Sequence, residues 1–481
     1  MDLSRRLALL LVLAACGSHA HGNTDAGVDG GYVADACEGL RCFQAGDLCA
    51  QKGLPPTTLS GTVYAPNGTL PLYGVDVYVP ETDPGPLMAG AICARCDQGL
   101  QGGAIVSTKT DEYGRFKLEN VPATASVPLV IQTGKWRRQL TIANVAACED
   151  QPLAATETRL PKNHMEGDLP KIAISTGGAD AFECLPLKLG IDPIEFTNPT
   201  GTGHIHMYTN PVGGPDAGGS PAGQGANKFA TTNWTGGTGN FGASQTLWAN
   251  VDNMKPYDIV ILSCEGDQYP GSKGTTGLAA LKSYADLGGR VFLSHWQNVW
   301  LEGATGATAP PEWGVGAGIG GPVATWNNSG TSFTSPPYAG GTSLPDIIDE
   351  VANPKGASFA TWMMGPEVMG STIRGQIPIK DGKQTCTGVG MGTEQWTTWT
   401  NQVVPPATFP QNFQFTTPRE LSSDQRCGKV VFSDMHVSST ASSDPLTPFP
   451  GGCNLATPLS QQEKALAFMF FDIASCVGSI F

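Results

Sequence analysis

The chain has 481 residues, which is enough for two or three domains with a full-sized core. Its formal net charge is −14, from 28 Lys and Arg against 42 Asp and Glu. This balance argues against nucleic-acid binding, which needs a basic surface, and against binding of the folded part to an anionic membrane surface. Charged residues make up only 15% of the chain, whereas 62 Gly and 37 Pro predict long loops.

The N-terminus has the pattern of an export signal. Arg5 and Arg6 form a positive region, and the apolar run after them is too short to span a bilayer as a permanent helix. The sequence LAAC ending at Cys16 resembles the lipobox of bacterial lipoproteins. This resemblance implies a signal peptide at 1–15 and a lipidated Cys16; an ordinary secretory signal with an incidental cysteine is the alternative. We therefore expect an exported protein whose acyl chains anchor it to the bacterial cell envelope, at the outer membrane or cell surface.

The segment after the signal predicts a tether and then disulfides. Residues 16–36 are small, polar and acidic, which is typical of a flexible linker, and residues 37–56 are rich in cysteine. Without Cys16, six cysteines lie on each side of residue 160, and even counts indicate disulfides formed in an oxidising compartment. The disulfide candidates are Cys37, Cys42, Cys49, Cys93, Cys96, Cys148, Cys184, Cys264, Cys386, Cys427, Cys453 and Cys476.

Residues 57–160 contain short alternating strands separated by turns. The sequence has a Ser-Gly-Thr-Val strand at 60–63, a Gly-Val-x-Val strand at 74–77, and Thr-Asp-x-x-Gly-x-Phe at 110–116 before an Asn-Val-Pro exit. These features resemble the carboxypeptidase regulatory-like (transthyretin-like) domain, which implies a seven-stranded β-sandwich without catalysis of its own.

Two motifs in this span leave alternatives open. Cys93 and Cys96 have the spacing of a redox pair, but no thioredoxin-like context surrounds them, so we expect structural bridges. The basic run that contains Trp136 is as well suited to contacting a glycan or partner as to packing its Trp against the next domain.

From residue 168 onward the pattern becomes that of an α/β domain. An apolar strand at 257–263, a helix that stops at Gly288-Gly289 and a second strand at 290–293 predict a crossover between parallel strands. A further buried strand ends near His436, and a capping box at Ser460 opens the last helix. Long insertions at 193–250 and 302–345 are expected to be loops. The Gly-rich turn after the first strand lacks a nucleotide-binding motif.

These segments together resemble the class I glutamine amidotransferase-like fold, and within it the trehalose-utilisation (ThuA-like) branch, over residues 168–478. The resemblance implies a flavodoxin-like, mostly parallel sheet. The nucleophilic Cys of true amidotransferases is absent, because Ser294 and His295 stand where it would be. Amidotransfer through a cysteine thioester is therefore excluded. The fold class expected for the whole chain is α/β plus all-β, with a small N-terminal β-sandwich.

Ligands of such sheets bind beyond the carboxyl ends of the strands, so the residues there are the candidates for a site. An acid–base role is expected for His295, His436, Glu265 and Asp434. Ligand contacts are expected for Asp267, Ser294, Trp296 and Gln297. Three alternatives remain open: a metal held by the two histidines with the neighbouring acids, Ser294 as a nucleophile with His436 as base, and histidines that merely cap the strand ends.

Metal and cofactor binding are not expected. His204 and His206 have a spacing that metals use, but no acid or third His is close to them in sequence. The Trp residues of the long loops are equally suited to stacking on sugar rings and to packing. The function expected is a non-catalytic binding or scaffold module for a glycan or an envelope protein. The alternative is a ThuA-like sugar-active enzyme or hydrolase that uses His295, His436 and neighbouring acids.

Overall fold

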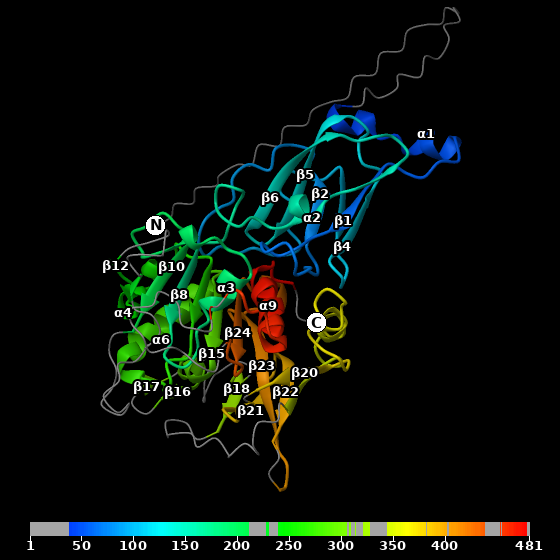
Figure 1. Cartoon of the computed structure of the whole chain (residues 1–481). Coiled ribbons are helices and arrows are strands. Elements are labelled where there is room, and N and C mark those ends of the chain that lie inside the picture. Colours follow the sequence, from blue (N-terminus) through cyan, green and yellow to red (C-terminus); the bar gives the residue numbers. More distant parts are fainter. Residues whose placement is uncertain are drawn as a thin grey trace, which may run out of the picture. The chain divides into compact units, whose positions relative to one another are not determined.

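A computed structural model describes residues 38–210, 228–229, 239–304, 307–308, 313, 321–327, 344–380, 382–401, 404–437, 453 and 455–478. The expected signal peptide with the tether, Cys16 and Cys37 lie outside these residues, as do parts of the two expected insertions. The described part combines helices with several sheets, so the chain is a mixed α and β protein (Figure 1).

Strands β1 to β7 form two small sheets, one with the order β4-β1-β7 and one with the order β3-β2-β5-β6 (Figure 1). On β4, Phe116 and Leu118 are buried while their neighbours are exposed, the period of two expected of a half-buried strand. Both share a hydrophobic core with Val77 of β2 and Leu129 of β5, so the two sheets bury one apolar cluster. The strands are β1 (Thr58–Thr62), β2 (Asp76–Val79), β3 (Val106–Lys109), β4 (Arg115–Glu119), β5 (Ala125–Thr133), β6 (Trp136–Asn144) and β7 (Asp150–Pro152). The short helices around them are η1 (Gly39–Phe43), α1 (Gly46–Gln51) and α2 (Ala155–Thr158).

The second half of the chain builds an 11-stranded sheet with the order β13-β10-β8-β14-β15-β24-β23-β22-β19-β20, and β9 pairs with β10. The parallel strands are β8 (Ile172–Thr176), β9 (Phe196–Thr197), β10 (Ile205–Thr209), β13 (Gly242–Ala243), β14 (Ile259–Leu262), β15 (Arg290–Ser294) and β24 (Gly428–Ser433). The other strands are β19 (Leu344–Ile348), β20 (Gln376–Ile379), β22 (Thr393–Thr400) and β23 (Thr408–Thr417). Short two-stranded pairs are formed by β11 (Lys228–Phe229) with β12 (Gly239–Asn240), β16 (Gly303–Ala304) with β17 (Ala307–Thr308), and β18 (Ala324–Trp326) with β21 (Cys386–Val389).

The sheet is mostly parallel, as expected, but one side of it is antiparallel. In sheet order, the neighbours from β13 to β24 pair parallel, whereas those from β24 through β23, β22 and β19 to β20 pair antiparallel. The reason is the length of the connections. Only residues 401–407 join β22 to β23 and only residues 418–427 join β23 to β24, and connections this short cannot carry the chain back for a parallel pairing.

The helices complete the α/β layers. Helix α6 (Pro270–Asp286) connects the parallel neighbours β14 and β15, as the sequence predicts. Helix α9 (Gln461–Ala474) begins at the predicted capping box, in which the Ser460 hydroxyl accepts from the backbone of Glu463 and the Glu463 carboxylate accepts from the backbone of Ser460. The others are α3 (Cys184–Lys188), η2 (Pro193–Glu195), α4 (Ser244–Leu247), α5 (Val251–Met254), η3 (His295–Asn298), α7 (Val299–Glu302), α8 (Gly356–Met363) and η4 (Ser423–Gln425). Within the described part of the chain, none of them is long and apolar enough to span a membrane.

Helix α9 packs against the small sheets as well as against the large one. The Trp136 ring lies 6.2 Å from the ring of Phe470 and 5.9 Å from that of Phe471, so this Trp packs on the next domain rather than facing a ligand. The turn before it needs glycine: Gly134 has φ +54, and a Cβ there would lie 1.8 Å from the Ala474 carbonyl oxygen.

Disulfides also connect the two parts. Cys49–Cys148 and Cys184–Cys453 each lie within one part, whereas Cys93–Cys427 and Cys96–Cys476 link the sandwich to the sheet domain. Cys42 is disulfide-bonded too. Cys93 and Cys96 therefore form structural bridges to two different partners. This is the expected outcome, and they are not a redox pair.

Two of the disulfide candidates are not bridged. Cys264 and Cys386 are free and buried. Cys386 lies in β21, where its thiol donates to the Gly388 carbonyl at 3.3 Å. Cys264 instead faces a histidine at the edge of the sheet. The prediction of disulfides is therefore wrong for these two, because each side chain ends among groups that are not cysteines.

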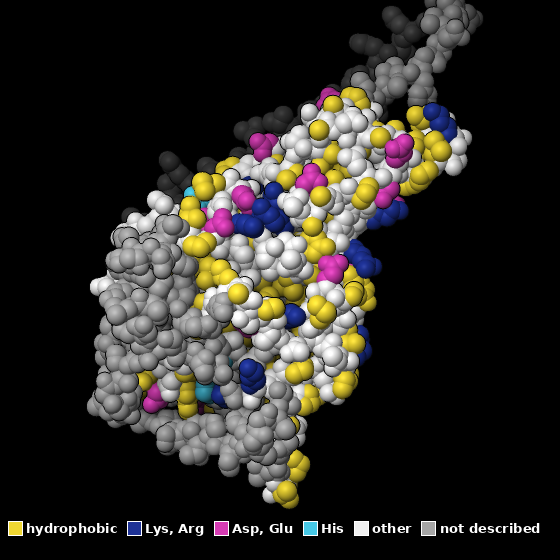
Figure 2. Space-filling view, viewed as in Figure 1, with side chains coloured by type: hydrophobic (Ala, Val, Ile, Leu, Met, Phe, Trp, Pro, Cys, Tyr) yellow, Lys and Arg dark blue, Asp and Glu magenta, His cyan; other side chains and the backbone are white. Residues whose placement is uncertain are grey.

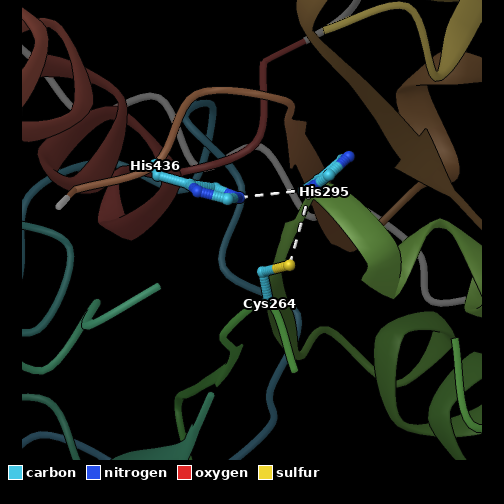
Figure 3. A group of neighbouring side chains, drawn as sticks. All are labelled: Cys264, His295 and His436. Carbon is cyan, nitrogen blue, oxygen red and sulfur yellow. Dashed lines mark hydrogen bonds between the residues drawn. The ribbon is translucent and has the colours of Figure 1, made fainter. Parts of the chain in front are cut away.

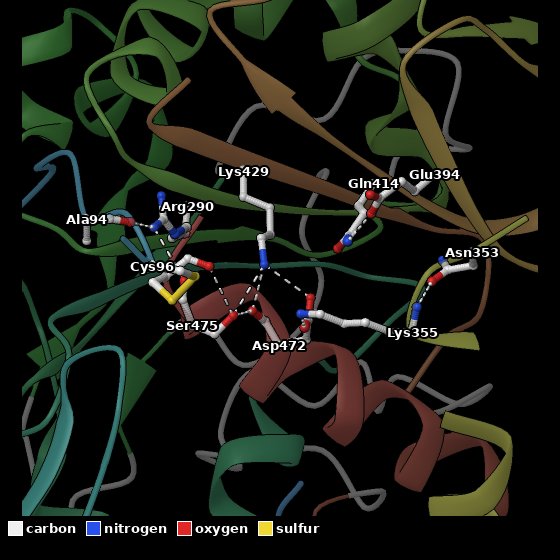
Figure 4. Close-up of polar contacts among 11 residues, drawn as sticks. Ala94, Cys96, Arg290, Asn353, Lys355, Glu394, Gln414, Lys429, Asp472 and Ser475 are labelled. Atoms are coloured by element: carbon white, nitrogen blue, oxygen red, sulfur yellow. Dashed lines mark hydrogen bonds and ion pairs between the residues drawn. A yellow bond between two sulfur atoms is a disulfide. The ribbon is translucent and has the colours of Figure 1, made fainter. Parts of the chain in front are cut away.

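Polar contacts reinforce the same junction (Figure 4). The Arg290 guanidinium donates to the carbonyls of Cys427 at 2.6 Å and Ala94 at 3.4 Å. Burial lowers the pKa of Lys429 to about 8, although Asp472 opposes this shift. Burial alone would raise the pKa of Asp472, but the ammonium groups of Lys355 and Lys429 hold it below its ordinary value.

Candidate functional site

The carboxyl ends of four adjacent parallel strands bring the predicted residues to one edge of the sheet. The strand order there is β8-β14-β15-β24, and the residues just after these strands include Asp180, Cys264, His295 and His436. The register pairs Leu262 with Leu293 and Ser294 with Ser433. The ends of β14, β15 and β24, which precede the cysteine and the two histidines, are therefore level.

Three side chains converge at this edge (Figure 3). The Cys264 sulfur lies 3.5 Å from Nδ1 of His295, and Nε2 of His436 lies 3.2 Å from the same Nδ1. All three residues are buried, and their potential ligand atoms lie within 4.8 Å of one another. The expected proximity of His295 and His436 is therefore observed, but they form a buried cluster with a cysteine that the sequence analysis assigned to a disulfide.

The backbone at His295 is unusual. This residue has φ +44, in the left-handed region that favours glycine, directly after β15. Its Nε2 atom is buried and has no hydrogen-bond partner among the described residues. Non-glycine residues in this conformation cost about 1–3 kcal/mol and cluster at functional sites. The fold therefore holds the His295 ring at the cluster against a local conformational preference.

Burial keeps all three groups uncharged. It lowers the pKa of His436 to about 3 and that of His295 well below its ordinary value, and the nearby Lys383 ammonium acts in the same direction. Burial raises the pKa of the Cys264 thiol to about 12. A buried thiol of this kind is a poor nucleophile, since the thiolate is the reactive form. Burial likewise raises the pKa of Asp434 to about 7, opposed by Lys383.

The remaining predicted residues at this edge are held by neighbours. The Ser294 hydroxyl donates to Asp180 at 2.6 Å, so it does not pair with His436 as a nucleophile would. Glu265 forms a buried ion pair with Lys273 at 2.7 Å, which removes it from the histidines.

Of the three other residues expected to contact a ligand, two face away from the histidine cluster. Gln297 donates to the Ser263 carbonyl and accepts from the indole of Trp300, both at 2.7 Å. Asp267 is exposed and accepts from the backbone of Gln268. Only Trp296 is in contact with the cluster, since its ring lies 4.9 Å from that of His295.

Sequence reasoning missed Asp180 and Glu183, which follow β8. Asp180 accepts from Ser294 and from the backbone of Val437, at 2.8 Å, and so holds the segment after β24 against the edge. Glu183 is fully buried, and burial together with Asp180 raises its pKa to about 8. The signal in the sequence is the Gly177-Gly178 turn after the first strand of this domain. The backbone needs a small residue there, because a Cβ on Gly177 would lie 2.0 Å from the Cys264 carbonyl oxygen.

The histidines at 204 and 206 do not act together. His206 lies in β10 and hydrogen-bonds the hydroxyl of Tyr257 at 2.7 Å. His204 precedes the strand, and its ring stacks on that of His164 at 5.3 Å. The buried Glu195 carboxylate lies 2.6 Å from His164 Nδ1 and accepts from the backbone of His204. An acid and a third histidine are thus close in space, which the sequence did not indicate.

Most Trp residues of the loops are packed rather than presented to a sugar. Trp300, Trp313 and Trp396 are fully buried, and Trp248 and Trp399 nearly so. Trp296 and Trp326 are half-buried, and Trp234 lies outside the described residues. Sugar stacking on these rings is therefore excluded for the buried ones, because their faces are already covered by protein.

Two cavities lie at the junction of the small sheets and the sheet domain, away from the histidine cluster. One, of about 620 Å³, is lined by Gln98, Gln101 and Gln132 from the sandwich and by Asp258 and Arg290 from the sheet domain. The other, of about 350 Å³, adjoins it and is lined by the residues around Lys429 and Asp472. On the face seen in Figure 2, acidic, basic and hydrophobic side chains are interspersed.

No protein family model and no curated protein matches the chain. The chain is similar over part of its length to solved structures of a type II cohesin–X-dockerin complex from Acetivibrio cellulolyticus, an N-terminal and a C-terminal interface mutant. Identity is 18% and 19%, and each match covers 28% of this chain and 85% of the other. The TM-scores of 0.17 and 0.16 are too low to bear on fold or function.

Proposed function

We propose that the chain is an exported, lipid-anchored protein of the bacterial cell envelope that binds a glycan without transforming it. The lipobox-like sequence at Cys16 supports the anchor, and the disulfides of the folded part support an oxidising compartment. In this proposal residues 57–160 are a carboxypeptidase regulatory-like domain. Residues 168–478 are a class I glutamine amidotransferase-like (ThuA-like) domain with a flavodoxin-like parallel core.

The observation that carries the proposal is the 620 Å³ cavity at the junction. This volume is in the range of small-molecule sites, which often lie between domains. Amide side chains in its wall offer donors and acceptors, and Leu87, Met88 and Ile92 add apolar surface. This combination suits the hydroxyls and the apolar faces of a sugar. The Gln132 side chain lines this cavity, and its amide group donates to the Gly134 carbonyl at 2.9 Å, which fixes its orientation in the wall.

The junction is also rigid, which favours binding. The Cys93–Cys427 and Cys96–Cys476 bridges cross it, and the Lys135 ammonium pairs with Asp258. A cavity whose walls are fixed relative to each other loses less conformational entropy when a ligand binds.

The second candidate is the ThuA-like sugar-active enzyme or hydrolase, and one observation favours it. Cys264, His295 and His436 converge at the strand edge where enzymes of open α/β folds act. Against it, the thiol has a raised pKa, Ser294 is bonded to Asp180, and Glu265 is paired with Lys273. These partners leave the expected acid–base set without an activated nucleophile.

A glycan array with the mature protein tests the proposal, with Gln132→Leu as the site variant. Loss of one hydrogen bond of about 1–1.5 kcal/mol predicts roughly a tenfold weaker affinity for the bound glycan. Gln139→Leu is the matched control, because Gln139 is exposed on the neighbouring strand β6. Mass spectrometry of the incubated glycan distinguishes the alternatives. Intact glycan supports binding, whereas products that His436→Ala abolishes would establish the enzyme instead.

A further inference from the structure

The cluster of Cys264, His295 and His436 has the composition and spacing of a metal site. One thiol and two imidazoles are the side chains that zinc prefers. They follow the ends of β14, β15 and β24, three neighbouring strands whose ladders hold those ends level. Segments far apart in the sequence are thus brought to one place by rigid elements.

The distances match those of a tetrahedral zinc ion. Zinc bonds of about 2.3 Å to sulfur and about 2.0–2.1 Å to nitrogen place a sulfur and a nitrogen ligand about 3.5 Å apart, and two nitrogen ligands about 3.3 Å apart. The corresponding distances are 3.5 Å from Cys264 Sγ to His295 Nδ1 and 3.2 Å from His436 Nε2 to His295 Nδ1. The third distance, between Cys264 and His436, is within 4.8 Å, and tetrahedral zinc requires this pair to approach to about 3.5 Å.

Hydrogen bonds alone satisfy the cluster poorly. Nδ1 of His295 is the neighbour of both the thiol and the His436 ring, yet an imidazole nitrogen has a single in-plane lone pair. It can therefore accept well from only one of them. A cation between the three groups would instead take one lone pair from each. In Figure 3 both dashed contacts, from Cys264 and from His436, meet at the Nδ1 atom of His295.

We propose that Cys264, His295 and His436 bind one zinc ion, with the fourth position left to water or a ligand. Binding forms one Zn–S and two Zn–N bonds and releases the thiol proton to solvent. The His164–Glu195–His204 group is the other set of this kind among the described residues, but it has no sulfur ligand. The two sites can therefore be distinguished spectroscopically.

Cobalt(II) is the probe, because thiolate ligation gives a sulfur-to-cobalt charge-transfer band in the near ultraviolet that imidazole and carboxylate ligation do not give. The mature protein, stripped of metal by a chelator, is titrated with Co²⁺ and then with Zn²⁺. We expect the band to saturate at one equivalent and zinc to displace it. Cys264→Ser is expected to abolish the band, and His436→Gln to weaken binding at least tenfold.

Cys386→Ser is the matched control, because Cys386 is the other free buried thiol and has no histidine in its cluster. It should keep both the band and the stoichiometry. Circular dichroism confirms that each variant is folded. If Cys264→Ser does not fold, His436→Gln tests the site with the thiol retained. The proposal is overturned if the wild type gives no band. It is also overturned if the band survives in folded Cys264→Ser, or if folded His436→Gln binds cobalt with unaltered affinity.

Discussion

Replacing Glu183 by Gln tests the electrostatics at the edge of the sheet. Neither carboxylate oxygen of Glu183 has a hydrogen-bond partner among the described residues, and burial raises the pKa from its ordinary 4.5 to about 8. The folded protein therefore keeps a proton on this group at pH 7, whereas the unfolded chain has released it. A Gln has nearly the same shape and cannot ionise, so the substitution removes this difference.

The sign and size of the effect follow from proton binding. Between pH 4.5 and 8 the folded state holds more protons than the unfolded state, so the free energy of unfolding falls as pH rises. Each pKa unit corresponds to about 1.4 kcal/mol, which sets an upper limit of about 5 kcal/mol for the complete loss. We expect Glu183→Gln to match the wild type near pH 4.5 and to be several kcal/mol more stable at pH 8.

Urea unfolding followed by circular dichroism, from pH 4.5 to 8.5 without reductant, measures this difference. Glu149→Gln is the control, because Glu149 is exposed and the same change of side chain there leaves the buried groups untouched. A stability difference for Glu183→Gln that stays constant over the pH range would refute the raised pKa. So would a variant that is less stable than the wild type at pH 8, since the wild type would then benefit from the ionised group.

Three further sets of substitutions probe a disulfide, the packing of α9 and a buried ion pair. Replacing Cys93 and Cys427 by Ala should lower the free energy of unfolding by about 4 kcal/mol, because with Cys96–Cys476 intact the lost bridge closes a loop of about 50 residues. Denaturant unfolding measures this change, and no change would mean that the unfolded chain is already restricted. In the same assay, Gly134→Ala should lower the free energy of unfolding by at least about 2 kcal/mol, because Gly134 has a positive φ and the Ala474 carbonyl lies close to it. A neutral effect would contradict the packing of α9 on this turn. Lys273→Met should lower the free energy of unfolding by about 3–5 kcal/mol, because it leaves Glu265 buried and unpaired. Adding Glu265→Gln should recover most of this loss. A double variant as unstable as the single one would contradict the pairing.

The sequence predicts the parts of this fold that depend on local pattern. The run at 257–263 contains β14, the helix ends before Gly288, and the capping box opens α9 at Ser460. Each of these depends on residues that are close along the chain: β-branched runs, a left-handed glycine and a side chain that caps the helix. The alternation that buries Phe116 on β4 is of the same kind.

What the sequence does not determine is pairing between distant segments. The even count of cysteines on each side of residue 160 favours bridges within each part, yet Cys93 and Cys96 bond to partners 334 and 380 residues away. The antiparallel side of the sheet was recoverable from its short connections, but only once β22 and β23 were recognised as strands. Their patterns, rich in Thr, Gln and Asn with Trp and Phe, lack the apolar runs that indicated β14 and β15.

The candidate site illustrates the same limit at the level of single residues. Sequence order places Cys264 and His295 at two strand ends, but it does not say toward which neighbour a side chain points. A thiol assigned to a disulfide because of its compartment lies 3.5 Å from an imidazole instead, and a glutamate assigned to catalysis faces Lys273. Both residues lie beyond the end of β14, where the alternation of a strand no longer sets the direction of a side chain. Chemistry at the edge of a parallel sheet therefore has to be argued from the side-chain positions there, and at this edge they bring together one thiol and two imidazoles, the ligands of the proposed zinc site.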